Sequence, residues 1–327
     1  MPALDEERLL SLGESLKSGN RRALARAITL AESSREDHQD QAQYLLENLL
    51  EETGGAVRLG VTGVPGVGKS TFIEAFGLFL IGQGKRVAVL AVDPSSGISG
   101  GSILGDKTRM QLLSRREEAF IRPSPSSGAL GGVARHTREA MLLCEAAGYD
   151  VVLVETVGVG QSEYMVASMV DFFLMLMIAG AGDELQGIKK GIVELADAIA
   201  VNKADGDNLA RAEAARAEYT SALRLLRPAT EGWQVPVQTV SSLHSHGMEE
   251  VWQTVQRHRE HLEARGDLVK KRAAQDEAWF WSVLREGLER RFLERPAIKQ
   301  QLGRLLAAID RKDTTPTQAA RSLLAQL

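Results

Sequence analysis

The chain has 327 residues, of which 44% are hydrophobic and 25% charged, an ordinary composition for a globular protein with a large core. Its 39 Lys and Arg are scattered among 43 Asp and Glu, for a formal net charge of -4, so we expect no nucleic-acid partner. The N-terminus is acidic where a secretory signal would be basic, and the longest apolar run, 172–182, is shorter than the ~20 residues of a membrane helix. We therefore predict a cytoplasmic protein with no membrane partner.

The hydrophobic pattern divides the chain into three parts. Apolar residues recur at helical spacing over residues 1–55, which predicts an N-terminal helical extension. From Val57, short β-branched runs alternate with helical stretches over 56–262, which predicts an α/β domain with a doubly wound, mostly parallel sheet. After Trp252 the strand patterns stop, and residues 263–327 are predicted to form a C-terminal helical arm. The single cysteine, Cys144, lies among apolar residues of helical spacing and is interpreted as part of the core.

A glycine-rich segment, GVTGVPGVGKST at 60–71, separates the first predicted strand from a helix. The spacing from Gly63 to Gly68-Lys69-Ser70 is that of a phosphate-binding loop, in which backbone N–H groups and a helix N-terminus face an anion. Lys69 would reach the β- and γ-phosphate oxygens, and the Ser70 hydroxyl would bind Mg²⁺. The predicted nucleotide-phosphate site consists of Gly63, Val64, Pro65, Gly66, Val67, Gly68, Lys69, Ser70 and Thr71.

The segment AVNKADGD at 200–207 follows another predicted strand and indicates guanine as the base. Asn202, Lys203 and Asp205 have the N-K-x-D arrangement, in which the Asp carboxylate accepts from both N1–H and the exocyclic amino group. Adenine lacks that donor pair, so a buried carboxylate would reject it. We predict GTP and GDP as ligands, with the loop that contains Ser241, Ser242 and Leu243 closing over the base. The alternative interpretation of residues 202–205 is a polar turn.

Three carboxylates between these two motifs are candidates for magnesium. Asp93 and Glu155 end predicted strands, where α/β sheets place ligand-binding residues, and Asp106 lies in a long Gly/Ser loop. Gly158 follows Glu155 closely, and its N–H could approach a γ-phosphate. The alternative for carboxylates at strand ends is helix capping.

Several motifs together resemble the MeaB/ArgK subfamily of metallochaperone-type P-loop GTPases over roughly residues 20–265. They are GVTGVPGVGKST, VDPSS, GSILGDKTRM, RPSPSSGALGG, LVETVGVGQSE, GDELQGIKKGI and VNKADGD. The resemblance implies a homodimeric GTPase that binds a coenzyme-B12-dependent acyl-CoA mutase, typically methylmalonyl-CoA mutase. Such a protein gates adenosylcobalamin delivery and protects the mutase from inactivation.

The resemblance also implies roles for individual residues. Lys69 and Ser70 would serve phosphate and Mg²⁺, and the 202–205 motif would read guanine. The metal would be supported by Asp93, Asp106 and Glu155. Three segments, 93–108, 155–161 and 178–189, would be mobile. Ala179 lies where the family often has proline. This departure bears on how stiff the third segment is and leaves the presence of the segment unaffected.

Hydrolysis would proceed by in-line attack of water on the γ-phosphoryl group, stabilised by Lys69, Mg²⁺ and backbone N–H groups such as that of Gly158. No motif forces a catalytic Gln or Arg into place, and Lys189 could supply a cation. We therefore expect a slow intrinsic rate that a partner accelerates.

Other classes of protein remain open at this point. A nickel-insertion GTPase would need a His/Cys cluster, but the chain has one Cys and six dispersed His. An ArgK-type small-molecule or protein kinase could use the same phosphate loop, although the guanine motif argues against it. A structural adaptor with a vestigial site conflicts with the intact Lys69 and Ser70.

The C-terminal segment DEAWFWSVLREGLERRFLE at 276–294 places aromatic residues around a predicted helix. Burying them on all sides requires more than one neighbour, and two-fold symmetric oligomers are common. We predict that this arm pairs with its copy in a homodimer. The alternative is that it packs only on its own GTPase domain.

Overall fold

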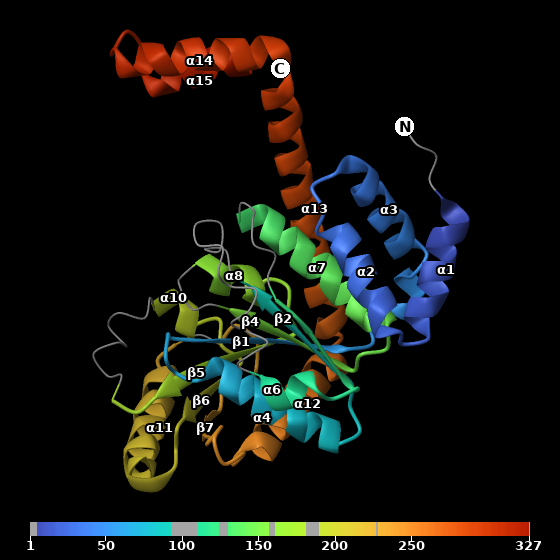
Figure 1. Cartoon of the computed structure of the whole chain (residues 1–327). Coiled ribbons are helices and arrows are strands. Elements are labelled where there is room, and N and C mark those ends of the chain that lie inside the picture. Colours follow the sequence, from blue (N-terminus) through green and yellow to red (C-terminus); the bar gives the residue numbers. More distant parts are fainter. Residues whose placement is uncertain are drawn as a thin grey trace. The chain divides into compact units, whose positions relative to one another are not determined.

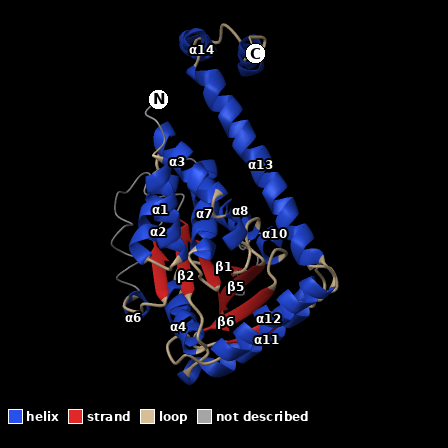
Figure 2. Cartoon of the chain, turned by 90° about the vertical axis from the view of Figure 1, so that its right-hand side faces the viewer, coloured by secondary structure: helices blue, strands red, loops and turns tan. Residues whose placement is uncertain are grey.

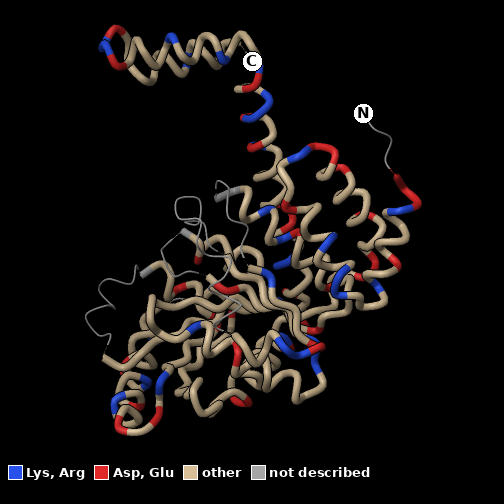
Figure 3. The backbone as a smooth tube through the Cα atoms, viewed as in Figure 1, with Lys and Arg blue, Asp and Glu red and all other residues tan. Residues whose placement is uncertain are grey.

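The computed structural model describes residues 5–92, 110–123, 130–156, 161–180, 190–226 and 228–326 (Figure 1). The chain forms two compact units, Met1–Gln275 and Asp276–Leu327. The three-part division expected from the sequence, with boundaries after residues 55 and 262, stays a prediction. Lys and Arg are interspersed with Asp and Glu along the described backbone (Figure 3).

A sheet of seven parallel strands lies at the centre of the first unit (Figure 2). The strands are β1 (Val57–Gly63), β2 (Val87–Val92), β3 (Ala119–Arg122), β4 (Val151–Thr156), β5 (Phe172–Ile178), β6 (Ala198–Asn202) and β7 (Val237–Thr239). Their order is β3-β2-β4-β1-β5-β6-β7, and every neighbouring pair is parallel. The predicted parallel α/β fold is confirmed.

Helices cover both faces of this sheet (Figure 2). One core joins α1 (Glu6–Lys17), α2 (Arg21–Ala31), α3 (Glu36–Glu47), α7 (Leu130–Ala146) and α8 (Gln161–Ala167) to the sheet, and a second contains α4 (Lys69–Gly82), α6 (Gln111–Ser114) and α12 (Met248–Ala264). A third core joins α10 (Lys190–Val193) and α11 (Leu209–Leu223) to β5, β6 and β7. The remaining helices are α13 (Asp267–Glu294), α14 (Pro296–Asp310) and α15 (Pro316–Leu324), and short 3₁₀ turns span Leu50–Glu52 and Gly206–Asn208. Within the described ranges, none of the helices has the length and apolar content to span a bilayer.

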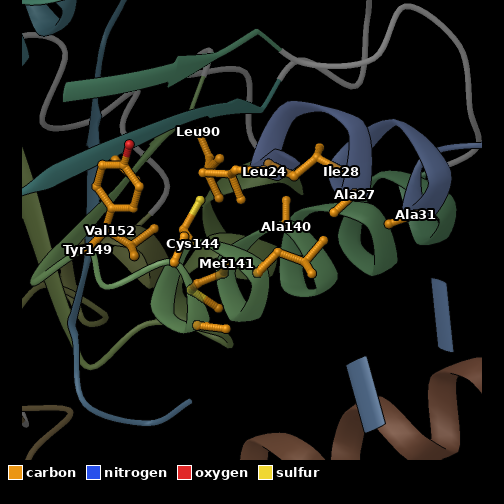
Figure 4. Close-up of a cluster of buried hydrophobic side chains, with 14 of the residues drawn as sticks. Leu24, Ala27, Ile28, Ala31, Leu90, Ala140, Met141, Cys144, Tyr149 and Val152 are labelled. Carbon is orange, nitrogen blue, oxygen red and sulfur yellow. The ribbon is translucent and has the colours of Figure 1, made fainter. Parts of the chain in front are cut away.

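The N-terminal helices share their core with the sheet. Leu24 and Ile28 of α2 lie with Ala140 and Cys144 of α7 close to Leu90 of β2 (Figure 4). All five side chains are at least 97% buried. Burial raises the pKa of the Cys144 thiol, which keeps it protonated, so its predicted place in the core is confirmed.

The start of α13 is fixed to the N-terminal ends of β1 and β5. Arg272 donates to both carboxylate oxygens of Asp171, at 2.8 and 2.7 Å, and to the Ala56 carbonyl oxygen at 2.8 Å. Gln275 Nε2 donates to the Val170 carbonyl oxygen at 2.9 Å. Because these bonds satisfy buried polar groups, the first turns of α13 belong to the unit that contains the sheet.

One buried acid on α7 lies in surroundings that disfavour its charge. Glu139 is 3% exposed, and its Oε1 accepts a hydrogen bond from Gln43 Nε2 of α3 at 2.8 Å. Burial raises the pKa of Glu139 to about 7, although Arg135 and the Gln43 bond act in the opposite direction. The contact between α3 and α7 is therefore sensitive to pH near neutrality.

We predict that Glu139→Gln flattens the pH dependence of stability. The folded state holds the Glu139 proton more tightly than the unfolded chain, so this contribution is complete below pH 4.5 and is lost as the pH rises through about 7. The loss is of the order of 3 kcal/mol at most. In urea unfolding between pH 5 and 8, the free energy of unfolding of the variant should rise relative to that of the wild type as the pH rises. Glu263→Gln, at a half-exposed ion pair, is the control, and an identical pH profile for Glu139→Gln and wild type would contradict the assignment.

Candidate nucleotide-binding site

The loop between β1 and α4 has backbone angles that require glycine. Gly66 and Gly68 have φ values of 82° and 95°, and Gly63 has 148°. A Cβ at Gly63 would lie 2.5 Å from the Leu176 carbonyl oxygen, and one at Gly68 would lie 2.9 Å from Asn202 Nδ2. Val67 is fully buried and anchors the loop in the core. The loop is thus held directly before the N-terminus of α4, as a phosphate site requires.

Lys69 crosses this loop. Its Nζ donates to the Gly63 carbonyl oxygen at 2.7 Å and lies 3.4 Å from that of Val64. Burial lowers the pKa of Lys69, while the charges of Glu155 and Glu163 raise it. The ammonium group is therefore held at the centre of the loop, where the β- and γ-phosphate oxygens of a nucleotide would lie.

Ser70 and Glu155 form the part of the site that suits magnesium. β4 lies beside β1 with Glu155 opposite Val61, and the Ser70 hydroxyl donates to Glu155 Oε1 at 3.1 Å. A hydroxyl and a carboxylate are hard oxygen ligands of the kind that Mg²⁺ prefers. In the described part of the chain, no group of three or more His, Cys, Asp or Glu could hold a metal. This donor set fits Mg²⁺, which usually binds one or two protein ligands together with substrate phosphates and waters.

Glu163 is a further acid that the sequence analysis did not assign. It lies in the first turn of α8, is 3% exposed and accepts a hydrogen bond from the Ser162 hydroxyl at 3.1 Å. Its charge acts on Lys69 together with that of Glu155. The available signal was an acid at the start of a helix just after the predicted γ-phosphate loop, but a charged residue in a first helical turn is common.

Asn202, at the end of β6, joins the phosphate loop to the loop after β7. Its side chain is 1% exposed, and Nδ2 donates to the Val67 carbonyl oxygen at 2.8 Å. Its Oδ1 accepts from the backbone N–H of Ser242 at 3.2 Å and from the Ser242 hydroxyl at 2.7 Å. Lys203 Nζ donates to the Gly66 carbonyl oxygen at 2.9 Å. Two residues of the predicted base motif therefore bind the phosphate loop directly.

Asp205 lies against the same loop after β7. Its Oδ2 accepts a hydrogen bond from the Ser241 hydroxyl, and Ser241 pairs with His246 through two backbone bonds. Leu243, at the tip of this turn, is 74% exposed. The structure thus brings together the three segments that the sequence analysis combined into one site.

Four predicted site residues lie outside the described residues: Asp93, Asp106, Gly158 and Lys189. Most of the three segments predicted to be mobile lies outside them as well. β2 ends at Val92, which is opposite Thr156 of β4.

A parallel sheet, a glycine loop with Lys69 across it, and an N-K-x-D motif held against that loop define a P-loop nucleotide-binding protein of the GTPase type. The family model described as "Methylmalonyl Co-A mutase-associated GTPase MeaB" matches residues 24–297. The chain belongs to this family, which confirms the resemblance noted in its motifs.

Relatives match along nearly the whole chain. A protein of Caulobacter vibrioides is 56% identical over 99% of this chain and 98% of its own length. The GTPase ArgK of Escherichia coli is 48% identical over 98% of this chain and 97% of its own. The mitochondrial methylmalonic aciduria type A homolog of Mus musculus is 47% identical over 94% of this chain and 77% of its own.

A solved structure has the same fold. It is described as an LAO/AO transport system kinase, has 42% sequence identity and a TM-score of 0.78, and the match covers 99% of this chain and 98% of that one. With relatives named as GTPases, the predicted enzyme class, a GTP hydrolase, is confirmed.

We predict that Lys69→Ala lowers GTP turnover at least ~100-fold, because it removes the cation that faces the β- and γ-phosphate oxygens. Phosphate release by the purified variant, measured at saturating GTP, tests this. Lys270→Ala is the control, since Lys270 is exposed and contacts only Asp267 among the described ion pairs. Turnover at the wild-type rate in Lys69→Ala would mean that another loop is the active one.

Proposed function

We propose that this GTPase binds GTP with Mg²⁺ at the loop of residues 63–71 and uses the nucleotide to regulate a coenzyme-B12-dependent acyl-CoA mutase. The observation that carries the proposal is the match to the mutase-associated GTPase family over residues 24–297. The contacts among Lys69, Ser70 and Glu155 support the chemistry.

The protein groups would act on GTP in separate ways. Lys69 exchanges its contacts with the Gly63 and Val64 carbonyl oxygens for the β- and γ-phosphate oxygens, and loop N–H groups bind the same phosphates. Ser70 and Glu155 would hold Mg²⁺, with Asp93 and Asp106 as further supports. The metal, when bound, neutralises charge that develops on the phosphate oxygens.

Water attacks the γ-phosphoryl group in line, with the N–H of Gly158 and the side chain of Lys189 assigned to stabilise the developing charge. Because neither assignment supplies a group that activates the water, the intrinsic rate is slow. Binding of a partner accelerates it by ordering these groups in advance.

Asp205 is assigned to guanine, with Lys203 alongside the base and the Ser241-Ser242-Leu243 loop closing over O6. The Asp205 carboxylate is held by Ser241, so it has a fixed direction from which to accept two N–H donors. The structural role of Asn202 supports the same site, because it holds the phosphate loop against the base loop.

We predict that Asp205→Asn lowers GTP affinity by ~100-fold or more and raises affinity for xanthosine triphosphate, whose C2 oxygen accepts from the amide. Titration with GTP, XTP and ATP measures the change, and ATP distinguishes the kinase alternative. Asp207→Asn, an exposed neighbour in the same turn, is the matched control. Unchanged preference for GTP over XTP would place the base pocket elsewhere.

The proposed partner is methylmalonyl-CoA mutase or a similar B12-dependent acyl-CoA mutase. The protein would gate adenosylcobalamin delivery and protect the mutase from inactivation. The family description and the name of the Mus musculus relative support this assignment. We also propose that the protein is cytoplasmic.

A homodimer is the proposed assembly, with the helical arm as its interface. In the second unit, Phe280, Trp281 and Leu288 are 60%, 46% and 56% exposed, and Leu306 and Leu324 are exposed as well. Exposed apolar side chains at this density within one small unit are typical of a protein–protein contact.

We predict that a complex with the mutase forms with a non-hydrolysable GTP analogue and is weaker with GDP, because the partner recognises the nucleotide state. Size-exclusion chromatography with light scattering on mixtures measures both, and the same runs give the mass of the free protein, expected to be that of two chains. An acyl-CoA enzyme that does not use B12 is the control. The proposal fails if the mutase elutes alone with either nucleotide.

A further inference from the structure

Helices α8 and α10 lie near each other in Figure 1, and Tyr164 of α8 contacts Gly191 of α10. A Cβ added to Gly191 of α10 would lie 2.0 Å from the Tyr164 hydroxyl oxygen of α8 and 3.4 Å from the ring carbon Cζ. The phenol hydroxyl therefore lies directly against the Gly191 backbone. Any larger residue at position 191 would displace it.

The tyrosine belongs to a helix that is fixed to the phosphate side. The preceding residue, Glu163, is buried and acts electrostatically on Lys69. Val166 is fully buried over Gly60 of β1, where a Cβ would lie 2.9 Å from its Cγ1. Arg138 of α7 donates to the carbonyl oxygen of Ser168, just beyond the end of α8, at 2.7 Å. These contacts fix α8 to β1 and α7, and the charge of Glu163 links it to Lys69 of the phosphate loop.

Gly191 belongs to a helix that leads into the base side. Ile192 and Val193 are 8% exposed and pack in one core with Val201 of β6 and Met177 of β5. The chain then turns directly into β6, the strand that ends at Asn202. A shift of α10 would therefore be transmitted to Asn202, which binds Ser242 in the loop after β7.

We propose that Tyr164 is a positioning residue that couples the phosphate side of the site to the base side through its contact with Gly191. It acts without touching the nucleotide, by setting the position of α10 against α8. This inference rests on the proposed use of Lys69 and Glu155 for phosphate and Mg²⁺. Its loss should impair discrimination between GTP and GDP and lower kcat.

The contact geometry provides a rescue experiment. Gly191→Ala clashes with the hydroxyl, whereas in Tyr164→Phe/Gly191→Ala the new methyl meets only the ring, at an ordinary 3.4 Å. We expect Gly191→Ala to lower the ratio of GTP to GDP affinity and kcat by about 5-fold or more, in the range of typical coupling energies. The double variant should return both to within about twofold of Tyr164→Phe.

Two further variants separate coupling from folding. Tyr164→Ala, at a side chain that is 48% exposed, should reproduce the loss in Gly191→Ala while keeping the wild-type melting temperature. Gly82→Ala, where a Cβ meets nothing within 4 Å, should change none of these quantities.

Three results would overturn the inference: a wild-type affinity ratio and kcat in Gly191→Ala, failure of the double variant to recover, or a change in KM alone with kcat intact. Lys69→Ala is measured in the same series. If it is inactive while Gly191→Ala behaves as wild type, the coupling is wrong and the phosphate site stands. If Lys69→Ala keeps its turnover, the proposed function is wrong, and the affinity ratios of the rescue pair still decide the coupling.

Discussion

The parallel pairing of β1 with β4 is the constraint on which the site depends. It places Val61 opposite Glu155, so the strand that leads into the glycine loop ends beside a carboxylate far away in the sequence. Parallel strands have their carboxyl ends at one edge, and each needs a crossover connection to return. The Ser70–Glu155 bond follows from this register, and α8 packs against both strands.

Buried ion pairs lie at the opposite side of the sheet, where β1 and β5 begin. Arg58 and Glu145 form an ion pair whose side chains are 8% and 0% exposed, and the Gly54 N–H donates to the same carboxylate at 2.7 Å. Asp171 likewise accepts from Arg272 and from the Arg58 backbone N–H. Such pairs contribute little net stability against an apolar alternative, but they are costly to break on one side. They define how α7 and the start of α13 meet the strands.

The sequence was sufficient for the fold and for the loop because both depend on local rules. Alternation of β-branched and helical runs predicts a parallel sheet, and Gly63 and Gly68 are required by backbone angle and close approach. The side-chain role of Asn202 could not be predicted in the same way. A buried amide that binds Val67 and Ser242 has the same sequence pattern as one that faces a base. Glu163 and the Tyr164–Gly191 contact depend on how α8 and α10 pack, and no local pattern encodes that.

Asn202 and Lys203 donate hydrogen bonds to the carbonyl oxygens of Val67 and Gly66, respectively. These bonds join the end of β6 to the glycine loop, although the two segments are far apart in the sequence. Lys203 has a φ of 60°, a left-handed conformation that is uncommon for lysine and that the surrounding bonds must maintain. These bonds hold the loop of residues 63–71 at a fixed separation from Asp205. In the proposed site, a nucleotide with its base at Asp205 would therefore have the reach of its phosphate chain set by the protein before any of the phosphates is bound.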